Sequence, residues 1–108
     1  MNNHKALSAL GMAMRAGKLA TGDEIVLKAI RAGKAKLVVL AGDASDNTKK
    51  KFNDKCSSYQ VSLVEAFDRA ALGGAIGKAE RVVIAVTDVQ FARLIAGHLS
   101  QNMEVDLT

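Results

Sequence analysis

The ionisable residues of this chain indicate binding to a polyanion. Its 108 residues hold fifteen Lys and Arg against eleven Asp and Glu, a formal net charge of +4 with a pI near 9.4. The excess lies at one end, because residues 1–36 carry seven basic and two acidic residues, whereas residues 37–108 carry eight and nine. A basic end on a small domain is typical of proteins that bind nucleic acid.

Two aspartates are the candidates for an enzyme site. Asp43 and Asp88 follow predicted strands, at the position where α/β proteins place active sites. Asp88 also stands where a helix N-cap is expected, so we interpret it as a cap and leave the role of Asp43 open. The sequence has no G-x-S-x-G motif, no P-loop and no G-x-G-x-x-G after a strand. We therefore predict that the protein is not an enzyme.

Metal and thiol chemistry lack the residues they need. His4 and His98 lie near opposite ends of the chain, without Cys, Asp or Glu at the spacing of metal ligands. The single cysteine, Cys56, excludes an internal disulfide and falls on the apolar face of a predicted helix, where we expect a buried, inert thiol. We predict neither a metal ion nor a cofactor.

Length and composition predict one globular domain over residues 1–108. The chain is 49% apolar and 24% charged, and it has no proline, no low-complexity run and no linker. No apolar run approaches the roughly 20 residues that span a bilayer, so a membrane partner is not expected. The first ten residues lack the apolar core of a signal peptide, which predicts a cytoplasmic protein.

Strand-like and helix-like apolar patterns alternate along the chain. Continuous apolar runs predict buried strands at 37–41 and 82–86, and weaker patterns predict strands at 18–21 and 60–65. Helices are expected between them, the second starting at Gly22 and three others capped by Asp46, Asp68 and Asp88. This alternation predicts an α/β fold, a single-domain three-layer α/β/α sandwich.

The spacing of apolar residues also predicts which helix faces are buried. The predicted inner residues are Leu7, Leu10 and Met14 on the first helix, the pairs Ile25–Ala29 and Val26–Ile30 on the second, Phe52, Cys56 and Tyr59 on the third, Leu72, Ala75 and Ile76 on the fourth, and Phe91, Leu94 and Ile95 on the last.

Two short strings remain to be explained. The run Lys49–Lys51 could contact phosphate, but we favour a solvated helix face, although cations at a helix start oppose its dipole. The string LGGAIG at 72–77 lies within a helical pattern, so its small residues are expected to let a helix approach a neighbour closely.

Several strings together resemble a known family. Residues 22–41 (GDEIVLKAIRAGKAKLVVLA), LGGAIG at 72–77 and IAVTD at 84–88 are similar to the kink-turn-binding ribosomal protein superfamily. This superfamily includes archaeal and eukaryotic large-subunit ribosomal proteins and box C/D guide-RNA proteins. The chain is most similar to its bacterial YlxQ-type branch, whose members are named as ribosomal or RNA-binding. The resemblance covers roughly residues 4–98 and implies an α/β/α sandwich with a mixed four-stranded sheet.

The resemblance also implies a binding site for structured RNA. Family members bind RNA with the start of the second helix and two neighbouring loops. Gly22 matches the glycine that opens the motif and Lys28 matches a base-contacting lysine, whereas Glu24 and Ile25 replace the Asn and Glu of the strongest kink-turn binders. In the loop 78–81, two cations stand where the family often presents apolar residues. The predicted RNA-binding residues are Gly22, Asp23 and Glu24 through their backbone amides, with Lys28, Arg31, Lys78 and Arg81.

We therefore predict a non-enzymatic RNA-binding protein of the translation machinery that recognises structured, kink-turn-like RNA. Its expected partners are structured RNA, above all ribosomal RNA, and ribosomal proteins. The alternative is a protein–protein adaptor that docks on a ribosomal or RNA-processing factor. A third reading, a small-molecule enzyme built on Asp43 and Asp88, has little support.

Overall fold

The computed structural model describes residues 4–107, with side-chain burial for residues 4–99. The predicted single domain 1–108 therefore includes four residues, 1–3 and 108, that lie outside the described part. Along the chain the elements are α1 (His4–Arg15), β1 (Leu19–Thr21), α2 (Asp23–Arg31), β2 (Leu37–Leu40), α3 (Asp46–Tyr59), β3 (Leu63–Glu65), α4 (Arg69–Ala75), β4 (Val83–Val86) and α5 (Val89–Leu107).

The four strands form one mixed sheet, as the resemblance implies. Their order is β1-β4-β2-β3, and β4 runs antiparallel to both of its neighbours whereas β2 and β3 are parallel. Every residue of β2 and β4 is buried, because these two strands occupy the middle of the sheet and are covered on both faces. The edge strands have only three residues each, so they expose few unpaired backbone groups.

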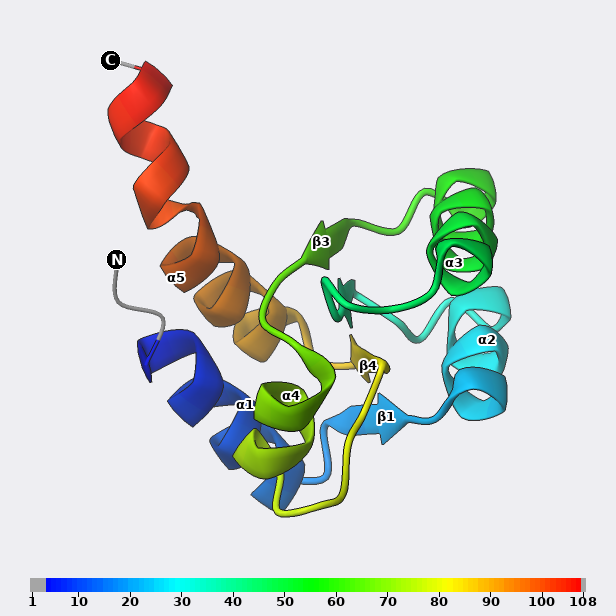
Figure 1. Ribbon diagram of the computed structural model, residues 1–108, viewed down its shortest axis with the longest axis horizontal. Coiled ribbons are helices and arrows are strands. Elements are labelled where there is room, and N and C mark those ends of the chain that lie inside the picture. Colours follow the sequence, from blue (N-terminus) through cyan, green and yellow to red (C-terminus); the bar gives the residue numbers. More distant parts are fainter. Residues whose placement is uncertain (1–3, 108) are drawn as a thin grey trace.

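Helices cover both faces of this sheet, which confirms the three-layer α/β/α sandwich (Figure 1). One face packs against α1, α4 and α5, and the other packs against α2 and α3. Successive residues of β2 alternate between the two layers, with Leu37 and Val39 in the first and Val38 and Leu40 in the second.

Three helix positions predicted to be buried are exposed. Ile25 is 58% exposed, Tyr59 46% and Leu94 41%. In α2 the sheet contacts a narrow stripe that includes Leu27, so Ile25 lies outside it. In α3 the buried stripe ends with Cys56, one turn before Tyr59, and in α5 the residues that reach the core include Ile95 but not its neighbour Leu94.

Two predicted element boundaries also need correction. Ser45, not Asp46, caps α3, because the Ser45 hydroxyl accepts from the N–H of Thr48 at 3.2 Å. The strand predicted at 60–65 is shorter, since Gln60 ends α3 in the left-handed conformation and β3 begins at Leu63. The caps at Asp68 and Asp88 are confirmed by bonds to Ala71 N (2.8 Å) and Phe91 N (2.9 Å).

Gly73 of LGGAIG permits a close backbone contact, as expected, and Gly11 of α1 permits another. A Cβ at Gly73 would overlap the carbonyl of Ala79, and a Cβ at Gly11 would lie 2.9 Å from the carbonyl oxygen of Ala75. The N–H of Lys78 donates to the Gly73 carbonyl at 2.9 Å. The loop 78–81 is therefore seated directly on α4, and α4 on α1.

Within residues 4–107, none of the helices combines the length and apolar character needed to cross a membrane.

Candidate nucleic-acid interface

The start of α2 has free backbone donors. Gly22 precedes the helix with φ +96°, which is favourable only for glycine, and no side chain caps the first turn. The first N–H groups of a helix have no intrahelical acceptor, so the amides of Asp23, Glu24 and Ile25 remain available to a ligand. By contrast, side chains cap α3, α4 and α5. Free amides and the positive end of the dipole together make an anion-binding position.

Three predicted residues share one exposed stripe of α2. Glu24, Lys28 and Arg31 are spaced i, i+4 and i+7, and all three are exposed. Lys28 lies one turn from the free amides. Arg31 ends the helix, about 12 Å along its axis from Asp23, so the structure does not bring it to the start of α2. The side chain of Ile25 projects beside Lys28 into solvent.

The loop before β4 lies at the same end of the sheet as the start of α2. Thr21 at the end of β1 pairs with Ile84 near the beginning of β4, so Gly22 and the residues just before β4 are neighbours. Arg81 stands at this end of the loop, and its Nη1 donates to the carbonyls of Ala79 (3.3 Å) and Glu80 (2.9 Å). Lys78 is exposed at the other end of the loop, where it leaves α4.

A lysine that the sequence did not assign to the site also lies there. The Nζ of Lys51 is 3.3 Å from Oδ2 of Asp23, which brings a cation from α3 to the first turn of α2. Its neighbours also pair with carboxylates, Lys49 with Glu65 and Lys50 with Asp54. In the sequence, the only sign of this position is that Lys49–Lys51 stand at a helix start, where cations oppose the helix dipole. The ion pairs with Asp23 and Glu65 explain why cations are nevertheless found there.

The aspartates of the enzyme alternative hold helices in place. Asp43 accepts from the N–H of Arg69 (3.0 Å) and lies 3.5 Å from its Nε, which fixes the start of α4. Asp88 caps α5. The two residues follow β2 and β4, which are antiparallel, so they lie at opposite ends of these strands and cannot act on one substrate.

The remaining reactive groups are also structural. Burial raises the pKa of the Cys56 thiol to about 11, so it stays protonated at neutral pH and is a weak nucleophile. Among the described residues, no three His, Cys, Asp or Glu side chains come together as potential metal ligands.

Comparison with known proteins places this architecture in a family. The profile of the ribosomal protein L7Ae/L30e/S12e/Gadd45 family matches residues 4–96. The RNA-binding protein YlxQ of Bacillus subtilis is 53% identical over 83 residues, which cover 77% of this chain and 83% of that protein. The RNA-binding protein YlxQ of Enterococcus faecium is 49% identical over 92 residues, 85% of this chain and 88% of that protein.

A solved structure has the same fold. It is that of a Bacillus halodurans protein described as having unknown function, and it superposes with a TM-score of 0.88 at 49% sequence identity. The match covers 90% of this chain and 98% of that one, so the similarity extends over nearly the whole sandwich.

Proposed function

This chain belongs to the ribosomal protein L7Ae/L30e/S12e/Gadd45 family, and on that premise we propose that it is a non-enzymatic RNA-binding protein whose site is the start of α2. The observation that carries the proposal is the uncapped first turn after Gly22, next to three cations from different elements: Lys28, Lys51 and Arg81. Two relatives at about 50% identity are named RNA-binding proteins, which supports the same assignment.

The proposed ligand is a structured, kink-turn-like RNA, with ribosomal RNA as the first candidate. Irregular RNA exposes base edges in a widened groove, where amides and a lysine can reach them. The free amides of α2 would bind a phosphate or a base edge, and Lys28 would reach one turn further. Lys51 and Arg81 would hold flanking phosphates.

A protein–protein adaptor is the second candidate, because one observation favours it. Ile25 is the most exposed of the large apolar side chains whose burial is described, and it lies in the middle of the proposed site next to the charge of Glu24. An exposed aliphatic residue suits a protein interface better than a phosphate backbone. The salt dependence of binding separates the two candidates.

Binding of a short structured RNA should weaken steeply with salt. If Lys28, Lys51, Lys78 and Arg81 each neutralise a phosphate, the logarithm of the affinity should fall with the logarithm of salt concentration at a slope of about −3 to −4. A filter-binding titration of a stem-loop RNA at several salt concentrations measures this slope. A slope near zero would contradict the RNA proposal and favour the adaptor.

Replacing Lys28 by alanine should weaken RNA binding by about 1–3 kcal/mol, because the ammonium would reach a base edge or phosphate. The melting temperature should barely change, since this side chain is exposed. Lys50→Ala is the matched control, because Lys50 is exposed on α3 and pairs only within its own helix. If Lys28→Ala binds like the parent while Lys51→Ala loses affinity, the RNA contacts α3 and not the outer stripe of α2.

A further inference from the structure

Cations without an ion-pair partner gather at one end of the strands, where β1, β2 and β3 begin and β4 ends. This end of the sheet lies opposite to the start of α2. We call this surface the basic edge, and its residues, all exposed, are Lys18, Arg31, Lys34, Lys36 and Arg93. Among the described side chains none of these five forms an ion pair, whereas Lys49, Lys50, Lys51 and Arg69 all do. The nearby acid Asp88 is occupied as the cap of α5.

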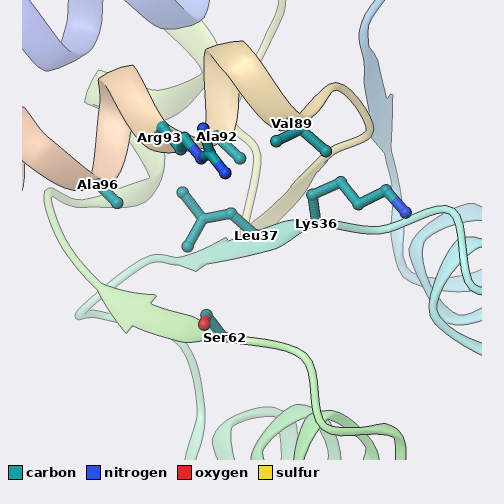
Figure 2. Close-up of a pocket in the computed structure, with 7 residues that line it drawn as sticks. All are labelled: Lys36, Leu37, Ser62, Val89, Ala92, Arg93 and Ala96. Atoms are coloured by element: carbon teal, nitrogen blue, oxygen red, sulfur yellow. The ribbon is translucent and has the colours of Figure 1, made fainter.

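A pocket of about 330 Å³ opens at this edge (Figure 2). It lies between the first turns of α5, the beginning of β2 and the residue before β3. Its lining residues are Lys36, Leu37, Ser62, Val89, Ala92, Arg93 and Ala96. Figure 2 shows Val89, Ala92, Arg93 and Ala96 along α5 facing Leu37, with Ser62 on the opposite side. The small side chains of Ala92 and Ala96 leave this space between the helix and the sheet.

The pocket combines apolar walls with cations that lack a partner carboxylate. Leu37, Val89 and Ala96 supply aliphatic surface, and the Ser62 hydroxyl can donate or accept a hydrogen bond. Lys36 donates to the carbonyl of Gly33 at 3.1 Å, which leaves its ammonium two further donors. Arg93 presents a planar guanidinium that can stack on a base or bind a phosphate through two N–H groups.

These features fit a flat, weakly polar group attached to an anion. The volume is at the small end of ligand pockets, which suits one ring system and not an extended ligand. Sequence-specific recognition of RNA generally uses unstacked bases placed against apolar side chains or Arg planes, with phosphates bound outside. An acidic peptide would satisfy the two cations but would leave the aliphatic walls without a matching group.

We propose that this pocket binds one unstacked nucleotide of a single-stranded RNA segment. The base lies between Leu37 and the α5 residues Val89 and Ala96, and its phosphate binds Lys36 and Arg93. The other cations of the basic edge bind the flanking phosphates. This second site is separate from the start of α2, because the two lie at opposite ends of the strands.

Two titrations followed by NMR test the proposal. Uridine 5′-monophosphate should shift the amide signals of Ser62, Val89 and Ala96, and a short oligouridine should shift the same signals at lower concentration. The double variant Lys36→Ala/Arg93→Ala should bind the oligouridine at least about tenfold more weakly, because two charge-assisted contacts are lost. The logarithm of its affinity should also fall less steeply with the logarithm of salt concentration, the slope being smaller in magnitude by about 1 to 2.

The controls separate this site from that of α2. Lys5→Ala/Lys50→Ala removes the same charge from exposed lysines elsewhere and should bind oligouridine like the parent. Lys28→Ala should weaken binding of the structured RNA, while oligouridine should still shift the amide signals of Ser62, Val89 and Ala96 in this variant. Ala96→Leu fills the pocket and should weaken oligouridine binding with the basic residues intact.

Three results would overturn the proposal. If inorganic phosphate reproduced every shift that the nucleotide causes, the base would have no role. A short oligoglutamate binding more tightly than oligouridine would assign the edge to an acidic protein. Unchanged oligouridine binding by a folded Ala96→Leu variant would show that nothing enters the pocket.

Discussion

Replacing Gly73 by alanine should destabilise the fold by about 3 kcal/mol, which corresponds to a fall of more than 10 °C or so in Tm for a domain of this size. The added Cβ would overlap the carbonyl of Ala79, lying 2.6 Å from its carbon and 2.9 Å from the Cα of Glu80. All three contacts are with backbone, so no side-chain rotation relieves them. The loop 78–81 would have to leave α4, with loss of the hydrogen bond from Lys78 to Gly73.

The adjacent glycine is the matched control. Gly74 lies in the same helix, has a helical backbone and would place a Cβ in open space. Gly74→Ala should therefore stabilise the protein by about 0.5–1 kcal/mol, through helix propensity alone. Thermal unfolding of the two variants measures both effects. Equal changes in the same direction would contradict the close packing of loop 78–81 on α4.

Introducing the residues of the strongest kink-turn binders, with Glu24→Asn and Ile25→Glu together, should raise affinity for a standard kink-turn by about 1.5–3 kcal/mol, roughly tenfold to more than a hundredfold. The first change removes a negative charge that would repel the phosphates of RNA at the proposed site. The second supplies a carboxylate that would accept a hydrogen bond from a guanine edge, and a charge-assisted bond has this magnitude. Gel-shift titration with a kink-turn RNA measures the gain.

The structure shows that replacing Ile25 should not disturb the hydrophobic core. Ile25 is 58% exposed and the core stripe of α2 runs through Val26 and Ile30, so the double variant should keep its melting temperature. The single variants are the controls, and each should give only part of the gain. A folded double variant that still fails to bind the kink-turn would mean that Lys28 does not occupy the position of the family's base-contacting lysine. The protein would then recognise another RNA feature or none.

The fold was largely predictable because the central strands are buried on both faces. The runs at 37–41 and 82–86 contain no polar residue, and they correspond to β2 and β4. Helix faces were harder to predict, since an apolar residue at the flank of a stripe looks the same in sequence as one at its centre. Tyr59 and Leu94 are such flanking residues. The mixed order of the strands was implied by the family resemblance and not by the apolar pattern.

The candidate site was only partly predictable, because its parts come from distant segments. Gly22 and Lys28 are close in sequence, so their shared position follows from the helical repeat. The ion pair of Lys51 with Asp23 joins two helices, and no spacing rule reports it. The pocket of the basic edge needs Lys36, Ser62 and Arg93 together, and these approach one another only when the sheet has formed.

The position of β4 determines when the molecule can fold during synthesis. This strand is the last in the sequence, yet it lies between β1 and β2, so β1 has no neighbour until residues 83–86 have left the ribosome. Before then only the parallel pair β2–β3 can form, and an isolated pair of strands is marginally stable. The contact between α1 and α5, the first and last helices, is delayed further. Folding is therefore late and cooperative, and a nascent chain halted before β4 leaves both inner faces of its unfinished sheet open to other unfolded chains.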